Sequence, residues 1–547
     1  MNRRSMGFMQ VDPIQLHSQN TLMNDYRQNK EEIMKFFEYL PFTDLNQRMK
    51  DLGGYNFERE KLTQVLHTMN EKWDAPQSTF YNIERLKKEN SVVIIGGQQA
   101  GLLTGPMYTI NKVISIVQLA RQQEAELGVP VIPVFWIAGE DHDFDEINHI
   151  FLPDKSKMKK HKLLQRIFGK SSVSHIEIDS TYSNQWLNQL FEQLEETQYT
   201  KDLYHSVKSC LDKSSTYVDF FARVIYNLFS DEGLVLIDSA QPGVRRLESE
   251  HFVQLIERQP EISKDIVEAS QQLEQSGYTL SLDVKSTDAH IFYHKNNERI
   301  LLERNGAGEW IGKQKEVLFS TEELLDVARR HPELLSNNVV TRPLMQELLF
   351  PTLAFIGGPG EISYWAVLKP AFESLNIKMP PVIPRLSLTY IDRNIEKTLK
   401  KYEITPTFAV NHGINEMKEN WLASKSDPPI HKVASEIKLA VDQAHKPLRD
   451  IAKGIRADLG ELAEKNLYYL QCDIEYLEDR IIKTLEDKYA KELLEFDRIS
   501  IALHPQQGLQ ERIWNPLPWL NEYGNAFIKD ITNSPCSFEN DHYLVYI

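Results

Sequence analysis

An apolar run that ends abruptly in carboxylates constrains this chain more than any other stretch. Residues 131–139, Val-Ile-Pro-Val-Phe-Trp-Ile-Ala-Gly, are followed by residues 140–146, Glu-Asp-His-Asp-Phe-Asp-Glu. The run is too short to span a membrane and is typical of a strand that is buried on both faces of a parallel sheet. Ligands of open parallel sheets bind outside the carboxyl ends of the strands. The acidic cluster is therefore a candidate functional site.

Capping of the next helix is the alternative role for these acidic residues. Acidic side chains stabilise the N-terminal end of a helix, and this would explain Asp143, Asp145 and Glu146. Residues 140–142 come before any expected helix start, so capping explains them less well. We interpret residues 140–142 as functional and leave both roles open for the other three.

A second glycine-containing strand end precedes the apolar run. Residues 91–97, Ser-Val-Val-Ile-Ile-Gly-Gly, predict a strand, and a glycine-rich turn then leads into a helix that ends near Leu127. With the apolar run this makes one βαβ unit with parallel strands. The turn matches neither dinucleotide-binding nor P-loop spacing. Its glycines still allow close approach of a ligand, and Gln98, Gln99 and Thr104 can donate hydrogen bonds to an anion. A plain tight turn is the alternative.

Two further buried strands are predicted, and each is followed by residues that could bind a ligand. Residues 234–238 end in a carboxylate, and residues 352–357 lead into a second glycine turn. Beyond that turn stand Glu361, Tyr364 and Trp365. The alternative is that Glu361 caps a helix while the aromatic residues pack in the core.

The segments between the core strands look like insertions. Residues 155–230 are polar and predict helices, and residues 260–338 combine a helix over 261–275 with strand-like segments at 289–293 and 299–303. The core is expected to resume at residues 339–343. From such insertions we expect mobile lobes that cover the site.

The last third of the chain changes character. Apolar residues recur in alternating steps of three and four over residues 430–444 and 467–481, which is typical of coiled coils. A single rod at ~1.5 Å per residue would exceed about 100 Å. We therefore predict an antiparallel hairpin of helices 430–458 and 461–498, with a kink at Pro447. The aromatic-rich tail, residues 503–547, is expected to return to the core.

Composition limits the classes of function. The chain has 547 residues with 78 acidic and 62 basic side chains, a formal net charge of −16, which argues against binding of nucleic acid. Cys210, Cys472 and Cys536 lie far apart, so neither a disulfide framework nor a thiolate zinc site is indicated. The N-terminus lacks the apolar region of a signal peptide, and no segment is long and apolar enough for a bilayer. We expect a soluble, cytoplasmic protein that does not bind membranes.

Two other functions are compatible with these features. A metal-dependent hydrolase could use His142, Asp143, Asp145 and His149 as ligands. A non-catalytic scaffold could bind a partner through the coiled coil, although three polar strand ends argue against this. Nothing else in the sequence indicates a metal site.

Three motifs together resemble the BshC family, the cysteine-adding enzymes of bacillithiol biosynthesis. They are residues 96–112, 136–147 and 355–365, and the resemblance extends over essentially the whole chain. It implies an α/β fold, with a Rossmann-like core of the nucleotidylyltransferase type, two connective insertions and a C-terminal α-helical coiled coil that forms a homodimer. It also implies that the protein joins L-cysteine to glucosaminyl-malate.

This resemblance implies the following division of the chain. The core would cover residues 1–390 and include the insertions at about 155–230 and 260–338. The coiled-coil appendage would cover residues 391–502, and the tail, residues 503–547, would return to the core.

The chemistry of amide formation gives the candidate residues their roles. A carboxylate must be activated before an amine can attack it in water, so we expect ATP or ADP at the site. His142 is predicted to be the general base, tuned by Asp141 and Asp143, with Glu140 binding the cationic amine. The predicted substrate-binding residues come from the strand-end motifs: Gln98, Gln99, Thr104, Gly105, Tyr108, Trp136, Gly358, Glu361 and Tyr364.

The nucleotide is predicted at the base of the helical hairpin. Pro384, Arg385 and Leu386 leave the core there, while Gln507 and Arg512 return to it. Guanidinium groups bind phosphate bidentately and stack on rings, which suits a nucleotide. A structural junction held by ordinary hydrogen bonds is the alternative.

Overall fold

The computed structural model describes residues 9–17, 20–167, 169, 171–280, 282–296 and 298–547. Residues 1–8, on which the expected absence of a signal peptide rests, lie outside the described residues. The chain divides into two units by its internal contacts. The core unit comprises Met1–Leu152, Lys159–Tyr390 and Gln510–Ile547, and the helical unit comprises Pro153–Met158 and Ile391–Leu509.

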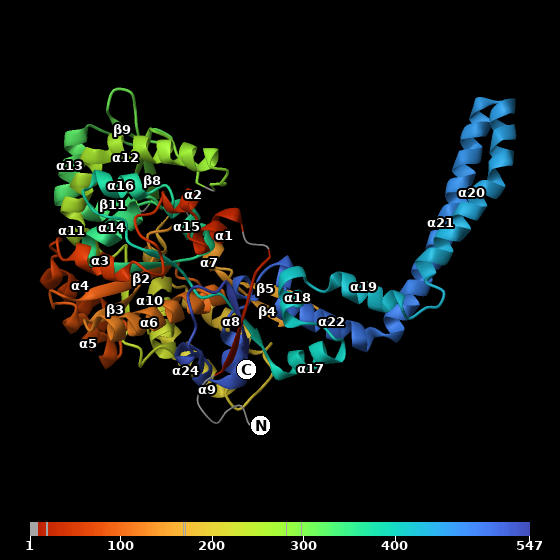
Figure 1. The fold of residues 1–547 in the computed structure, drawn as a ribbon, viewed down its shortest axis with the longest axis horizontal. Coiled ribbons are helices and arrows are strands. Elements are labelled where there is room, and N and C mark those ends of the chain that lie inside the picture. The colour runs from red at the N-terminus through yellow and green to blue at the C-terminus, as the bar shows by residue number, and fades with distance from the viewer. Residues whose placement is uncertain (1–8, 18–19, 168, 170, 281, 297) are drawn as a thin grey trace. The chain divides into compact units, whose positions relative to one another are not determined.

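A five-stranded parallel sheet forms the centre of the core unit (Figure 1). Its strands stand in the order β13-β12-β2-β3-β6. They are β2 (Val92–Gln98), β3 (Val131–Ile137), β6 (Val235–Asp238), β12 (Thr352–Gly357) and β13 (Val382–Pro384). The strand order reverses between β2 and β12, and in open α/β sheets a ligand crevice opens at such a reversal. The predicted Rossmann-like sheet and its buried strands are confirmed.

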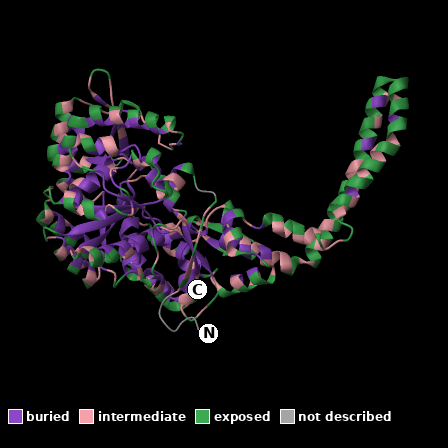
Figure 2. Ribbon diagram, in the orientation of Figure 1, coloured by how far each residue is buried: buried purple, intermediate pink, exposed green. Residues whose placement is uncertain are grey.

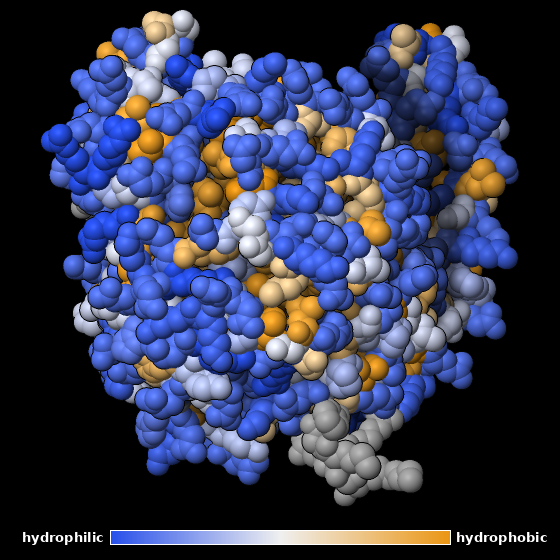
Figure 3. Space-filling view, turned by 60° about the vertical axis from the view of Figure 1, so that its left-hand side comes forward, coloured by the Kyte–Doolittle hydropathy of each residue, from blue (hydrophilic) through white to orange (hydrophobic). Residues whose placement is uncertain are grey.

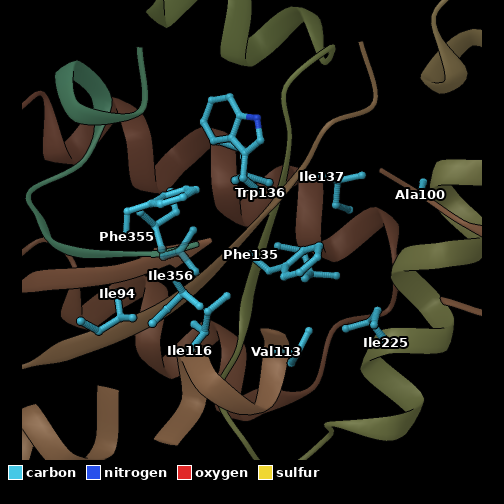
Figure 4. Packing of buried hydrophobic residues seen from close by; sticks show 14 of the residues in the cluster. Ile94, Ala100, Val113, Ile116, Phe135, Trp136, Ile137, Ile225, Phe355 and Ile356 are labelled. Carbon is cyan, nitrogen blue, oxygen red and sulfur yellow. The ribbon is translucent and has the colours of Figure 1, made fainter. Parts of the chain in front are cut away.

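Strand β3 is buried along its whole length, as the sequence predicts. Phe135 and Trp136 are fully buried and project in different directions from the strand (Figure 4). Gly97 of β2 pairs with Trp136, and a Cβ atom at Gly97 would collide with the Trp136 carbonyl oxygen. Glycine at this position therefore lets two buried strands approach each other without distortion.

The glycine-rich turn after β2 has an unusual backbone. Leu103, Thr104 and Gly105 all have positive φ angles, of 46°, 73° and 72°. This conformation strains residues that carry a Cβ atom, and such strain persists only where the surroundings impose it. The predicted helix follows as α6 (Met107–Leu127) and ends at Gly128, whose φ of 66° is the left-handed conformation that glycine favours.

Five helices precede the central sheet in sequence. They are α1 (Thr21–Arg27), α2 (Glu31–Met34), α3 (Leu45–Leu52), α4 (Arg59–Lys72) and α5 (Gln77–Arg85). Arg48 of α3 is fully buried, and its guanidinium pairs with the buried carboxylate of Glu347. Its Nε atom donates to the carbonyl oxygen of Thr352 at 2.9 Å. These contacts fix the N-terminal helices against the start of β12.

The first insertion differs from its predicted helical content at its start. Residues 149–162 form a β-hairpin with Lys155 at a φ of 46° in the turn, so the helical prediction is wrong for residues 155–162. Local polarity suggested a helix there, but only Met158 of the second strand is buried, a pattern that a two-stranded hairpin satisfies. The elements are β4 (His149–Asp154), β5 (Lys157–Lys162), α8 (Ser180–Phe191), α9 (Thr200–Asp212) and α10 (Tyr217–Leu228).

The second insertion contains an antiparallel sheet beside a long helix. The predicted helix over 261–275 is α12 (Ser249–Gln275), which begins earlier and includes Pro260. The predicted strands are confirmed in a sheet of order β10-β9-β8-β7-β11. Its strands are β7 (Asp288–Lys295), β8 (Glu298–Arg304), β9 (Trp310–Gly312), β10 (Leu318–Phe319) and β11 (Leu335–Asn337).

A helix begins at residues 339–343, where the core was expected to resume. Helix α14 (Thr341–Leu349) begins there, and Pro343 lies in its first turn, where no intrahelical N–H donor is required. Two helices follow the second glycine turn. They are α15 (Pro359–Trp365) and α16 (Lys369–Ser374).

The C-terminal tail returns to the core unit. Strand β15 (His542–Tyr546) lies between β1 (Gln10–Ile14) and β14 (Leu388–Ile391). Two short helices precede it, α23 (Leu517–Tyr523) and α24 (Ala526–Asn533). The tail thus completes a small sheet with the two ends of the chain paired antiparallel.

The helical unit contains the predicted antiparallel hairpin (Figure 1). Ion pairs join its two arms, for example Lys438 with Glu475 and Lys453 with Glu464. The chain reverses at Arg456, and Gly460 allows close packing against Lys453. Figure 2 shows mostly exposed and intermediate residues along both arms. The unit's helices are α17 (Arg393–Lys401), α18 (Pro406–His412), α19 (Asn415–Ala423), α20 (Ile430–Ile455), α21 (Ala457–Lys488) and α22 (Ala490–Leu503).

The surface seen in Figure 3 is mainly hydrophilic, with apolar side chains in scattered patches. Among the described residues, no helix has the length and apolar character needed to cross a bilayer.

A buried histidine in the terminal sheet should make the fold sensitive to acid. His542 is fully buried between the hydroxyl groups of Ser387 and Thr389, each at 2.8 Å. Burial lowers the pKa of His542 from 6.5 to about 4. The unfolded chain therefore binds a proton that the folded chain excludes, so stability is complete above pH 6.5 and falls as the pH decreases toward 4.

We expect His542 to remove about 2 kcal/mol from the free energy of unfolding between pH 7 and pH 5, from 1.36 kcal/mol per pKa unit. Denaturant unfolding of the wild type and of His542→Gln at both pH values measures this, and the variant should show the smaller pH dependence. Equal pH dependences would contradict the prediction.

Candidate active site

A cavity of about 90 Å³ opens beyond the carboxyl end of β2, within the core unit. Five of the predicted substrate-binding residues and one predicted nucleotide-binding residue line it. They are Gln98, Gln99, Thr104, Gly105, Tyr108 and Arg512. The strained turn and the start of α6 form one wall. The structure thus brings together the predicted residues of the first glycine turn.

Thr104 presents an unsatisfied hydroxyl to this cavity. Its side chain is fully buried, and within the described residues its Oγ1 atom has no hydrogen-bond partner. A buried hydroxyl without a partner destabilises the fold unless a ligand or water completes it. Asn515 holds the turn by donating to the carbonyl oxygens of Leu103 at 2.9 Å and Gly105 at 2.7 Å. The turn is therefore preformed around a polar group that can meet a ligand.

Lys112 connects the two strand ends at the reversal of strand order. Its buried Nζ atom donates to the Gly97 carbonyl oxygen at 2.7 Å and to Glu361 at 2.5 Å. Gln98 lies 3.3 Å from the same nitrogen. Burial outweighs the attraction of Glu361 and lowers the pKa of Lys112 below its ordinary value. Glu361 also accepts from the Gly358 N–H at 2.7 Å, so its capping role is confirmed alongside this ion pair.

Asp141 and His142 stand beside the cavity through Gln99. The Gln99 side chain donates to Asp141 at 2.5 Å, and the His142 N–H donates to the same carboxylate at 2.7 Å. The His142 Nδ1 atom lies 3.7 Å from Asp141. Burial opposes ionisation of Asp141, but Gln99, Arg299 and His142 outweigh it, and the pKa of Asp141 lies below its usual value. A carboxylate therefore faces a half-buried imidazole.

The remaining acidic residues of the cluster serve local structure. Asp143 accepts from the Glu146 N–H at 3.3 Å and caps α7 (Phe144–Ile147), so the capping interpretation is confirmed for it. Asp145 pairs with Lys162 at 2.8 Å. Over the parts of the chain that the structure describes, no three His, Cys, Asp or Glu side chains are grouped as metal ligands. A metal-dependent hydrolase at residues 140–149 is therefore not supported.

Glu140 is placed differently from its predicted role. Its buried carboxylate pairs with the guanidinium of Arg245, which also binds Glu248 at 2.6 Å. The Asn337 N–H donates to the same Glu140 oxygen at 3.3 Å. A carboxylate held in this way supports the second insertion and is not open to a substrate amine. The sequence could not show this, because Arg245 and Asn337 are remote from the motif.

Two arginines, Arg299 of the second insertion and Arg342 of α14, contact predicted site residues and were missed by sequence reasoning. Arg299 donates to the Asn337 carbonyl oxygen at 2.5 Å and lies 3.9 Å from Asp141. Arg342 donates to the hydroxyl of Tyr364, a predicted substrate-binding residue, at 2.5 Å. Neither arginine belongs to a motif with recognisable spacing, so only the fold reveals them. Trp136, also a predicted contact, is fully buried in the sheet.

The predicted nucleotide-binding residues differ in their surroundings. Arg385 is buried and forms a bidentate pair with Glu511, both bonds at 2.7 Å. Burial opposes ionisation of Glu511, but Arg385 outweighs it and lowers the pKa of Glu511 to about 2. This pairing occupies Arg385, whereas Arg512 lines the cavity and is exposed. Gln507 belongs to the helical unit. Pro384 and Leu386 are buried beside Arg385, and nucleotide binding stays a prediction.

These observations define a Rossmann-like α/β protein with a polar crevice at the reversal of strand order and a helical-hairpin appendage. Comparison with known families identifies it further. Residues 9–386 match the family described as "Bacillithiol biosynthesis BshC, N-terminal Rossmann-like domain". Residues 388–547 match "Bacillithiol biosynthesis BshC, C-terminal coiled-coil domain". The chain belongs to the BshC family, and the predicted membership is confirmed.

Curated relatives cover nearly the whole chain. A protein of Oceanobacillus iheyensis is 41% identical over 543 residues, which is 98% of this chain and 100% of the relative. Proteins of Bacillus licheniformis and Bacillus cereus are 41% and 40% identical over 540 and 538 residues, with the same coverage of both chains. Each of the three carries the name "Putative cysteine ligase BshC".

Replacement of His142 tests the assignment of the base. We expect His142→Ala to lower turnover by about 10²- to 10⁴-fold, the usual contribution of general acid–base catalysis. Steady-state rates with saturating substrates measure it, and thermal unfolding shows whether the fold is intact. Asp145→Asn is the matched control, because Asp145 is exposed and bonds to Lys162 and Asn148 and not to His142 or Asp141. Near-normal turnover of a folded His142→Ala protein would contradict the assignment.

Proposed function

We propose that this protein adds L-cysteine to glucosaminyl-malate, forming an amide bond to the sugar amine in the last step of bacillithiol biosynthesis. Family membership over the whole chain supports the pathway and the class of ligase. The observation that carries the chemistry is the Gln99–Asp141–His142 arrangement beside the cavity. It provides a base next to a ligand space at the sheet end.

The residues of the site divide the work of amide formation. A sugar ammonium must lose a proton before its nitrogen attacks, and the His142 imidazole accepts that proton. Asp141 remains a carboxylate and stabilises the imidazolium that forms. The attacked carbonyl oxygen becomes negative, and the unsatisfied Thr104 hydroxyl and the N-terminal end of α6 can stabilise it. Gln99 orients Asp141 by its hydrogen bond.

A nucleotide fits the donor set of the cavity. The unsatisfied Thr104 hydroxyl, the N-terminal end of α6 and Arg512 are the groups that would hold its phosphates. When bound, ATP supplies the energy that activates the cysteine carboxylate. The residues of the site keep water away and position the acceptor amine.

Product formation tests the proposed function directly. Purified protein is incubated with glucosaminyl-malate, L-cysteine and each nucleotide in turn, and products are identified by mass. We expect a product with the mass of the two substrates minus one water, formed only when all three components are present. The Thr104→Ala variant should need a higher nucleotide concentration for its half-maximal rate. Absence of this product with every nucleotide would contradict the proposal.

We also propose that the helical hairpin forms a homodimer. Its arms expose large apolar side chains, including Leu470 at 38%, Leu477 at 61% and Ile481 at 41%. A cavity of about 470 Å³ with an apolar lining opens between α20 and α21 near their turn. Apolar surface of this extent on a two-helix hairpin marks an association surface, because the hairpin alone cannot bury it.

Charged substitutions on this surface test dimer formation. We expect Leu470→Glu, Leu477→Glu and Ile481→Glu to convert a dimer into a monomer, because a buried carboxylate without a partner opposes association. Light scattering at micromolar concentration measures the mass. Lys483→Glu, at an exposed position of the same helix, is the control and should remain dimeric. A monomeric wild type would contradict the prediction.

A further inference from the structure

Arg342 is a charged side chain that forms no close ion pair within the described residues. Its Nη2 atom donates to the Tyr364 hydroxyl at 2.5 Å. Its Nε atom is buried and has no hydrogen-bond partner in the described residues, and no carboxylate there lies within ion-pair distance. Other buried arginines differ. Arg48, Arg245 and Arg385 each pair with at least one buried carboxylate.

The charge of Arg299 is only slightly better paired than that of Arg342. It is 8% exposed, and its guanidinium lies 3.7 Å from the centre of the Phe292 ring. Its Nε atom donates to Ser336 Oγ at 3.2 Å, and its nearest carboxylate oxygen is that of Asp141 at 3.9 Å. Burial and the nearby charges of Arg245 and Arg342 lower the pKa of Arg299, although Glu140 and Asp141 oppose this. Arg299 and Arg342 therefore repel each other across a short distance.

Both arginines connect to the cavity through short contact chains. Arg299 lies against Asp141, which accepts from Gln99, and Gln99 lines the cavity. Arg342 holds Tyr364 on α15, the helix that also carries Glu361. The first chain starts from β8 of the second insertion, and the second starts from α14, which follows that insertion. Both arginines are thus linked to predicted site residues.

A buried guanidinium N–H without an acceptor destabilises a folded chain, because its lost hydration is not replaced by a hydrogen bond. Such a group is stable when an external anion completes the pair. We propose that Arg299 and Arg342 form a subsite for the carboxylates of the malyl group. This subsite rests on the proposed function, which makes glucosaminyl-malate the acceptor. Arginine binds carboxylates through two parallel hydrogen bonds, which suits a dicarboxylate.

The chemistry of the reaction favours the malyl group over the other anions. The cysteine carboxylate must lose its charge on activation, so two arginines that stabilise its ionised form would oppose the reaction. The malyl carboxylates keep their charge throughout. Phosphate groups have their own donors at Thr104, Arg512 and the start of α6. The two arginines therefore bind the malyl group of the acceptor and not the groups that react.

Arg342→Met tests the subsite, since methionine keeps much of the side-chain volume without its charge. We expect the KM for glucosaminyl-malate to rise by about tenfold or more, with kcat and the KM values for cysteine and nucleotide changed by less than about threefold. Methyl glucosaminide, which lacks carboxylates, should be a poor acceptor for the wild type and equally poor for the variant. Arg330→Met, at an exposed position, is the matched control.

Stability measurements separate binding from folding. Arg342→Met should unfold at or above the wild-type temperature, because it removes an unpaired charge. Arg48→Met should unfold at a lower temperature, because it leaves Glu347 buried without its partner. If Arg342→Met does not fold, calorimetry on the wild type decides. It should bind glucosaminyl-malate at least about tenfold more tightly than methyl glucosaminide.

The outcomes distinguish the subsite from the proposed function. Selective binding of glucosaminyl-malate by a wild type that forms no product would overturn the proposed function and keep the subsite. Equal affinities for the two sugars, or an unchanged KM for glucosaminyl-malate in folded Arg342→Met, would overturn the subsite. A variant that instead loses affinity for cysteine or nucleotide would also overturn it.

Discussion

The buried ammonium group of Lys112 holds the site together at the reversal of strand order. It extends from α6 to the carbonyl oxygen of Gly97 on one side and to Glu361 on the other. The two glycine turns, which are remote in sequence, are thereby fixed at one edge of the sheet. Burying this charge opposes folding, and only its three oxygen partners offset that effect. The positions of Gln98, Gly358 and the start of α15 all depend on this contact.

The second insertion adds a further layer of charge to this edge. Arg245 is closed by two carboxylates, and through Glu140 it fixes the backbone of Asn337. That strand end then positions Arg299 against Asp141. The acidic cluster after β3 is therefore shared between two tasks. Glu140 supports the insertion, while Asp141 accepts from the His142 N–H and from Gln99, which lines the cavity. The buried ion pairs of Arg245 thus position Arg299 and Asp141, which are less completely paired.

Local patterns predicted a large part of this architecture. The uninterrupted apolar run gave β3, and the glycine after a helical segment gave the end of α6 at Gly128. Alternating three- and four-residue steps gave the hairpin of α20 and α21. Polarity alone failed at residues 157–162, because lysine-rich sequence occurs in exposed strands as well as in helices. Heptad spacing also could not locate the reversal at Arg456. The two glycines beside it, Gly454 and Gly460, lie inside α20 and α21 and do not mark the turn.

The candidate site shows where such reasoning stops. Residues next to a strand end, such as Asp141 and Thr104, are found because chain direction and strand burial place them. The state of each charge depends instead on partners more than 100 residues away, as with Glu140 and Arg245 at a separation of 105. Glu140 and Asp141 are adjacent and chemically alike, yet Glu140 is enclosed in a buried network, whereas Asp141 is partly exposed and bonded to Gln99, which lines the cavity. A motif therefore gives the position of a titratable group, while long-range packing decides whether that group is free to react.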